Sequence, residues 1–281
     1  MLIFNNKAGL ENVLSNYLNV KAAIGFVPTM GALHEGHLSL MQRSVSENDV
    51  TVVSIFVNPT QFNNPEDLEK YPRTLDADVE KIKTVSERII VFAPTTDEMY
   101  DGNTASTPFS FDGLENQMEG AFRPGHFDGV GTIVKKLFKI VRPTNAYFGE
   151  KDFQQLQIIK KLVEKENLPV HVIGCPISRL ANGLAMSSRN ERLTSQEKQD
   201  AGFIFSILQE ARKQFESQDI ESIKRYVDNA FAAHPEFSVD YFEIAAEDDL
   251  KPAIIKENKR YRAFIAVFLS NVRLIDNISL N

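Results

Sequence analysis

The sequence predicts an α/β protein: a doubly wound parallel sheet followed by a smaller α+β domain. Two observations support this prediction. In residues 1–177, short apolar runs alternate with amphipathic helical stretches, which is the order of a parallel sheet with helices on both faces. From residue 178 onward, two long helical patterns precede three alternating strands. We therefore expect one domain over residues 1–177 and a second over residues 178–281.

The predicted strands of the first domain are short continuous apolar runs, as expected for strands that are buried on both faces. They lie at Ala23–Pro28, Val50–Val57, Ile89–Ala93, Ala146–Phe148 and Val170–Ile173. Apolar residues at helical spacing predict helices at Val130–Val141 and Asp152–Glu166. The polar, turn-rich segment Thr95–Gly113 predicts a long surface loop.

The second domain has a different pattern. Helical spacing predicts helices at Ser195–Glu216 and Ile220–Ala233. Strands with alternating apolar residues follow at Ser238–Ala246, Tyr261–Leu269 and Arg273–Ile278. Helices followed by such strands favour a small α+β domain with an antiparallel sheet.

Composition and charge exclude several classes of protein. The chain has 38 acidic and 31 basic residues, and this excess argues against non-specific binding to nucleic acid or to an anionic membrane. Cys175 is the only cysteine, so an intrachain disulfide is impossible and a reducing compartment is expected. The longest apolar run, Ala263–Leu269, is too short to span a membrane, and the first residues are too polar for a signal peptide. We expect a cytoplasmic protein.

The segment Pro28–His37, after the first predicted strand, combines glycine with histidine. A strand that breaks at Gly31 and restarts as a helix at Gly36 is expected to present free backbone N–H groups, where a phosphate can bind. His34 and His37 are three residues apart, so on a first helical turn they would face the same way. This segment predicts an anion site.

Two other interpretations of the histidine pair remain open at this point. One is a polar turn with two solvated histidines. The other is a zinc site, although the metalloprotease signature has its histidines four residues apart and no third ligand cluster is evident. The position directly after the first strand of an α/β domain favours nucleotide binding.

Polar residues also follow two other strands. Asn58 and Gln61 follow the second strand, where neutral amides suit a small polar substrate better than a metal; a turn with a solvated glutamine is the alternative. The fourth strand runs into Gly149–Asp152, in which Asp152 is a plausible helix N-cap. Lys151 would then lie at a helix N-terminus, which is unfavourable unless an anion neutralises it.

The start of the second domain adds a group of hydrogen-bond donors. Asn182 and Gly183 predict a tight turn, and Ser187, Ser188 and Arg189 offer donors to a phosphate. A Ser-Ser-Arg sequence is a weak signal by itself. Its combination with the His-x-Gly-His segment strengthens the prediction of a nucleotide site.

Five blocks occur in order along the chain: VPTMGALHEGH at 27–37, FVNPTQF at 56–62, RPGHFDGVGTIV at 123–134, FGEKDFQQL at 148–156 and GLAMSSRN at 183–190. Together they resemble the pantothenate synthetases, the AMP-forming pantoate–β-alanine ligases. The resemblance extends over essentially the whole chain, to residues 273–277. It implies a Rossmann-like fold of the nucleotidyl transferase superfamily that carries a His-x-Gly-His signature, with the second domain as a lid.

The resemblance also implies the reaction. A ligase of this family acts in pantothenate and coenzyme A biosynthesis. It joins (R)-pantoate to β-alanine while ATP, a co-substrate, is converted into AMP and diphosphate, and it requires Mg²⁺. Pantoyl adenylate forms first, and attack by the amine then gives pantothenate. The family further implies a homodimer formed through the first domain.

Site residues follow from the matching blocks. The resemblance implies nucleotide contacts from Met30, Gly31, Ala32, Leu33, His34, Glu35, Gly36, His37, Gly149, Glu150, Lys151, Asp152, Ser178, Met186, Ser187, Ser188 and Arg189. The implied catalytic residues are His34, His37, Lys151 and Arg189. Pantoate contacts are implied for Gln61 and Gln155, and β-alanine contacts for Gln61 and Asn58. The sequence does not identify Mg²⁺ ligands, since phosphate oxygens and water can supply them.

The His-x-Gly-His segment is also compatible with two other functional classes. A nucleotidylyltransferase would use the same His-x-Gly-His segment, but its site for a phosphorylated substrate should be basic, whereas Gln61, Asn58 and Gln155 are neutral. A non-catalytic ATP-binding or regulatory protein is the third possibility. Such a protein would be expected to have lost part of the phosphate-binding set, yet both histidines, Lys151 and Arg189 are intact.

Overall fold

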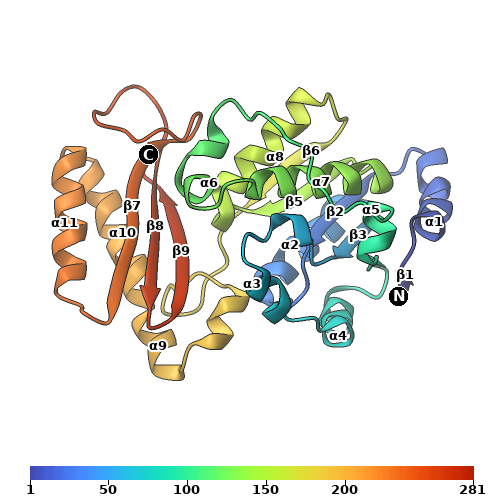
Figure 1. The fold of residues 1–281 in the computed structure, drawn as a ribbon, viewed down its shortest axis with the longest axis horizontal. Helices are drawn as coiled ribbons and strands as arrows, with labels where there is room; N and C mark the ends of the chain where they lie inside the picture. Colours follow the sequence, from blue (N-terminus) through green and yellow to red (C-terminus); the bar gives the residue numbers. More distant parts are fainter. The chain divides into compact units, whose positions relative to one another are not determined.

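The computed structural model describes residues 1–281, which form two compact units (Figure 1). Unit 1 comprises Met1–Glu150 and Gln154–Pro176. Unit 2 comprises Ile177–Asn281 together with the short segment Lys151–Phe153. In sequence this segment interrupts unit 1, but its contacts belong to unit 2. None of the helices has both the length and the apolar composition needed to cross a lipid bilayer.

A six-stranded sheet forms the centre of unit 1, in the order β1-β4-β3-β2-β5-β6, and every neighbouring pair is parallel. The strands are β1 Leu2–Phe4, β2 Ile24–Thr29, β3 Val50–Ile55, β4 Ile90–Phe92, β5 Asn145–Gly149 and β6 His171–Cys175. The predicted parallel sheet is confirmed, and the edge strand β1 was not predicted. The chain passes from β2 to β3 on one side and places β5 on the other. The carboxyl ends of β2 and β5 therefore form the topological switch point, where such sheets bind ligands.

Helices cover both faces of this sheet. They are α1 Lys7–Asn19, α2 Glu35–Glu47, α3 Pro65–Lys70, α4 Leu75–Val85, α5 Thr96–Tyr100, α6 Met118–Phe122, α7 His126–Val141 and α8 Phe153–Lys165. Met41 of α2 and Ile82 of α4 belong to one apolar cluster with Val27 of β2. The preceding strand residue, Phe26, points to the opposite face, and its ring lies 6.1 Å from that of Phe138 in α7. The doubly wound arrangement is confirmed.

The predicted surface loop over Thr95–Gly113 is wrong in part. The segment contains α5, and the side chains of Tyr100 and Phe111 are 3% and 1% exposed. The rest of the segment is attached to α7, since the Phe109 N–H donates to the Asp128 carboxylate at 2.9 Å. Aromatic residues within a polar sequence therefore anchor this segment to the core.

Unit 2 is a three-stranded antiparallel sheet with helices, in the order β7-β8-β9. Its elements are α9 Ser195–Asp200, α10 Gly202–Phe215, α11 Ile220–Ala232, β7 Phe237–Ala246, β8 Tyr261–Leu269 and β9 Val272–Ser279 (Figure 1). The predicted α+β architecture is confirmed. One detail is wrong, because the single helix predicted over residues 195–216 is two helices that meet at Ala201. A side chain at Gly202 would lie 2.7 Å from the carbonyl oxygen of Asn182, so a close backbone approach occurs where the helix breaks.

Candidate active site

Unit 1 brings several predicted site segments to the switch point of its sheet. Met30–His37 follows β2, Asn58 and Gln61 follow β3, and Gly149 ends β5. The Nε2 atom of Gln61 donates to the sulfur of Met30 at 3.0 Å, so the segments after β2 and β3 are in direct contact. Sequence segments far apart along the chain are therefore gathered at one edge of the sheet.

The loop between β2 and α2 uses its backbone N–H groups within the chain. The Gly31 N–H donates to the Thr29 hydroxyl at 3.2 Å. The N–H groups of Ala32 and Leu33 donate to the carboxylate of Asp78 at 3.0 and 2.7 Å. The expectation that this loop presents free N–H groups to a phosphate is therefore wrong for these residues, because the Thr29 hydroxyl and a buried carboxylate from α4 already accept their hydrogen bonds.

Asp78 also stabilises an unusual backbone conformation. Gly31 and Ala32 both have left-handed backbone, with φ of 81° and 50°. For a residue with a Cβ atom this conformation costs roughly 1–2 kcal/mol. Two hydrogen bonds from the Ala32 and Leu33 N–H groups to the Asp78 carboxylate offset that cost, and Lys81 Nζ donates to the Leu33 carbonyl oxygen at 2.5 Å. The loop is held in place by two side chains of α4.

The two histidines form a reciprocal cap at the start of α2. Nδ1 of His34 accepts from the Gly36 N–H at 3.2 Å, and Nδ1 of His37 accepts from the His34 N–H at 3.3 Å. Their ring centroids are 4.1 Å apart, so the predicted pair is brought together. Because both Nδ1 atoms accept, each neutral imidazole has its proton on Nε2. The cap therefore sets the same tautomer in both rings.

A buried network fixes the side chain of Gln61. Asn58 is 1% exposed, and its Nδ2 donates to Gln61 Oε1 and to the Gly129 carbonyl oxygen, both at 3.1 Å. The Tyr100 hydroxyl donates to Asn58 Oδ1 at 2.5 Å. Burial raises the pKa of the Tyr100 phenol, which favours the protonated, hydrogen-bond-donating form. Both the oxygen and the NH₂ group of the Asn58 amide are thus hydrogen-bonded within the protein, and the NH₂ group of the Gln61 amide donates to Met30.

The main chain at Gln61 is held as well. Its carbonyl oxygen accepts hydrogen bonds from His126 Nδ1 at 2.8 Å and from Arg123 Nη2 at 3.2 Å. Sequence reasoning assigned no role to His126, Tyr100 or Asp78. His126 lies in the block at 123–134, and the resemblance of this block to the family could have indicated a role for it. Tyr100 and Asp78 lie in segments for which no buried element was predicted.

In unit 2, the predicted donors lie at a tight turn around Gly183 and at the 3-10 turn that follows it. Ser178 and Met186 are paired, since the Met186 N–H donates to the Ser178 carbonyl oxygen at 2.9 Å across the tight turn. This turn has Gly183 at φ 93°, as its sequence predicts. Ser187 caps the following 3-10 turn by accepting from the Arg189 N–H at 3.3 Å.

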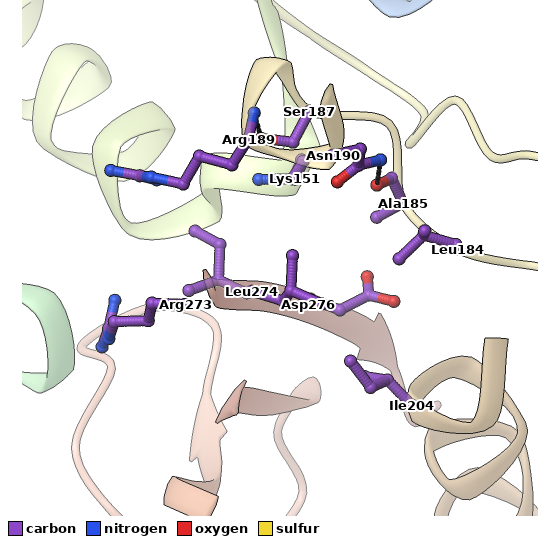
Figure 2. Close-up of a pocket in the computed structure, with 11 residues that line it drawn as sticks. Lys151, Leu184, Ala185, Ser187, Arg189, Asn190, Ile204, Arg273, Leu274 and Asp276 are labelled. Atoms are coloured by element: carbon purple, nitrogen blue, oxygen red, sulfur yellow. Dashed lines mark hydrogen bonds between the residues drawn. The ribbon is translucent and has the colours of Figure 1, made fainter. Parts of the chain in front are cut away.

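Lys151 and Arg189 line one pocket of unit 2 (Figure 2). Asn190, on the same pocket, is buried, and its Oδ1 has no hydrogen-bond partner within the chain, while its Nδ2 donates to Ala185 O at 3.1 Å. The other charged groups of the lining are paired, Arg273 with Asp240 and Asp276 with Arg179. Lys151 and Arg189 form no ion pair, so their charges are available to an anion.

The remaining predicted residues lie in the segment that follows β5. Glu150, Lys151 and Asp152 form a 3-10 turn before α8, with Glu150 in unit 1 and the other two in unit 2. Gln155 lies half-buried in the first turn of α8, in unit 1. The structure therefore divides the predicted site into one group in each unit.

No group of three or more histidine, cysteine, aspartate or glutamate side chains that could hold a metal ion occurs in residues 1–281. The side chains therefore do not fit as a cage for Mg²⁺ or for zinc.

The family model described as pantoate-beta-alanine ligase matches residues 2–279. A pantothenate synthetase from Flavobacterium psychrophilum is 58% identical over 281 residues, which are 100% of both chains. The chain belongs to the pantoate–β-alanine ligase family.

Two solved structures of this family cover 100% of the chain at 37% identity. One, from Thermus thermophilus, has a TM-score of 0.92 and is covered to 99%; the other, from Francisella tularensis, has a TM-score of 0.81 and is covered to 98%. The second is described as complexed with beta-gamma ATP and β-alanine.

Proposed function

We propose that this member of the pantoate–β-alanine ligase family condenses (R)-pantoate with β-alanine, with conversion of ATP into AMP and diphosphate. The observation that carries the proposal is the family match over residues 2–279. The site chemistry supports it, because neutral amides at Gln61 and Gln155 suit a small hydroxy acid better than a phosphorylated substrate. The ATP and β-alanine named for the Francisella tularensis relative are the same co-substrates.

In the first step, a carboxylate oxygen of pantoate attacks the α-phosphorus of ATP, and the bond from that phosphorus to the diphosphate oxygen breaks. This displacement needs alignment and charge stabilisation rather than a protein nucleophile. We assign the Nε2–H groups of His34 and His37 and the cations of Lys151 and Arg189 to the phosphates. The reciprocal cap supports donation by neutral imidazoles, since it leaves the proton on Nε2.

In the second step, the amine of β-alanine attacks the acyl carbon of pantoyl adenylate. The bond from that carbon to the AMP oxygen breaks, and the amine nitrogen loses a proton. We assign Gln61 and Gln155 to pantoate, and Gln61 to β-alanine as well. Asn58 is assigned an orienting role toward Gln61 in place of direct contact, because its amide is fully bonded within the protein.

The remaining assignments complete the nucleotide site. Contacts to the nucleotide are proposed for Met30, Gly31, Ala32, Leu33, Glu35, Gly36, Gly149, Glu150, Asp152, Ser178, Met186, Ser187 and Ser188. Residues 1–177 serve as the nucleotide- and pantoate-binding domain, and residues 178–281 as a lid that shields the adenylate from water. Mg²⁺ enters with ATP, its ligands being phosphate oxygens and water. The enzyme is a cytoplasmic homodimer.

The experiment that tests this proposal is isotope exchange between pyrophosphate and ATP. If adenylation precedes amine attack, labelled pyrophosphate enters ATP in the presence of enzyme, Mg²⁺ and pantoate, with β-alanine omitted. A nucleotidylyltransferase would exchange only with its own phosphorylated substrate, and a binding protein would not exchange. A requirement for β-alanine would contradict the adenylate order, and absence of exchange with pantoate under all conditions would contradict the ligase function.

A further inference from the structure

The segment Lys151–Phe153 is held at both ends by residues of β8 and β9. The carbonyl oxygen of Lys151 accepts a hydrogen bond of 2.9 Å from Nδ2 of Asn277. The ring of Phe153 has the Arg262 guanidinium 3.9 Å from its centroid and lies 6.0 Å from the ring of Phe264. The main chain that bears the Lys151 ammonium group is therefore fixed within unit 2.

Asn277 is itself held in one orientation. Its side chain is buried, its Oδ1 accepts from Arg262 Nη1 at 2.7 Å, and its N–H donates to Asp276 Oδ1 at 2.7 Å. Only the oxygen of an amide can accept from arginine, so the NH₂ group must face the carbonyl of Lys151. Asp276 is in turn fixed by two hydrogen bonds from Arg179, at 2.6 and 2.9 Å.

We propose that Asn277 is a positioning residue for the ligase reaction, which acts by fixing the main chain of Lys151. This inference rests on the proposed function, which assigns Lys151 to the phosphates of ATP. A lysine side chain has a flexible four-carbon stem, so its ammonium group is confined only if its main chain is. A cation that is already in place where charge develops stabilises the transition state without reorganisation. A small displacement of that cation loses much of this stabilisation.

A double-mutant cycle between Asn277 and Lys151 tests this role, with pyrophosphate exchange in MgATP and pantoate as the readout. Asn277→Asp keeps the size and the acceptor for Arg262, but it places a second oxygen against the Lys151 carbonyl. We expect Asn277→Asp to slow exchange about tenfold in the otherwise native enzyme and less than about twofold in the Lys151→Ala background. The KM for pantoate should not change in the single variant.

Glu247→Gln is the matched control, because Glu247 binds Arg262 at 2.9 Å in the same network and does not contact Lys151. It should leave exchange at the native rate. If Asn277→Asp does not fold, as judged by circular dichroism and thermal unfolding, Asn277→Ser provides the same comparison.

The outcomes separate this inference from the proposed function. Equal fold-losses in both backgrounds, or native exchange in Asn277→Asp, would overturn the positioning role while the ligase function stands. Native exchange in Lys151→Ala would overturn the positioning role together with the assignment of Lys151. A native enzyme that fails to exchange with pantoate would contradict the proposed function itself.

Discussion

At the scale of single residues, the histidine pair has two separable properties. Nδ1 of each ring caps the backbone of α2, whereas Nε2–H is the donor that we assign to the phosphates. Alanine removes both properties, but asparagine keeps a short-range acceptor for the cap and lacks the reach of Nε2. The two substitutions therefore distinguish a structural role from a catalytic one.

We expect His34→Asn and His37→Asn to lower the exchange rate by a factor on the order of 10², as for the loss of a preorganised donor. Their stability should stay near native, while His34→Ala should lose about 1 kcal/mol of unfolding free energy with its N-cap. Urea unfolding and exchange kinetics measure the two effects. His171→Asn, at an exposed histidine of β6, is the control and should change neither. Native exchange in both asparagine variants would exclude the catalytic assignment.

The amide network makes a second prediction at the residue scale. Asn58→Ala leaves Gln61 Oε1 without its donor, at a cost of about 1–3 kcal/mol, so the KM for pantoate should rise about tenfold or more. The KM for ATP should be nearly unchanged. In the Gln61→Ala background the same substitution should add little, because Asn58 acts through Gln61. Tyr100→Phe should show a smaller effect of the same kind. A rise in the KM for ATP alone would show that the network serves the nucleotide.

At the scale of elements, the β2–α2 loop depends on a helix distant in sequence. Asp78, 1% exposed, comes from α4 and accepts the N–H groups of Ala32 and Leu33. The loop conformation, with Ala32 at positive φ, is thus decided by the packing of α4 against α2. The histidine cap begins directly after this loop, so a change at Asp78 should also affect catalysis.

Asp78→Asn should lower the unfolding free energy by about 1–3 kcal/mol, because an amide cannot accept from both N–H groups as the carboxylate does. We also expect slower pyrophosphate exchange. The midpoint of urea unfolding measures the first effect. Asp76→Asn, at an exposed carboxylate in the first turn of the same helix, is the matched control and should unfold at the native midpoint. Identical midpoints for the two variants would show that Asp78 does not support the loop.

At the scale of the whole molecule, the two units do not follow the linear order of the chain. Lys151–Phe153 belongs to unit 2, although residues of unit 1 precede and follow it. The chain thus contributes a proposed phosphate-binding lysine to the C-terminal unit from a turn that follows a strand of the first sheet. Substitutions in β9 are therefore expected to influence the nucleotide chemistry.

The homodimer is the prediction that belongs to this scale. It follows from family membership, and we expect light scattering at micromolar concentration to give about twice the mass of one chain. Stability measured by urea unfolding should then increase with protein concentration, because dissociation contributes to unfolding. A mass equal to one chain, with unfolding independent of concentration, would contradict the dimer.

The sequence by itself determined the fold class and the family. The apolar runs of β2 to β6 and of β8, together with the apolar stripe on α7, reflect local burial, which neighbouring residues share and which therefore appears as a pattern in the sequence. The blocks at 27–37 and 183–190 likewise predicted which side chains we assign to the nucleotide. Where periodicity was short or mixed with polar residues, as in β1 and in α5, the pattern did not indicate an element.

Only the tertiary structure decided which donor meets which acceptor. The Leu33 N–H, expected to be free, binds Asp78, which is 45 residues away along the chain. Asn58, expected on a substrate, is enclosed by Tyr100 and Gly129. Lys151, expected in the first domain, is held by Asn277. Hydrogen bonds form between groups that the fold brings within about 3 Å, and separation along the chain carries no information about that distance.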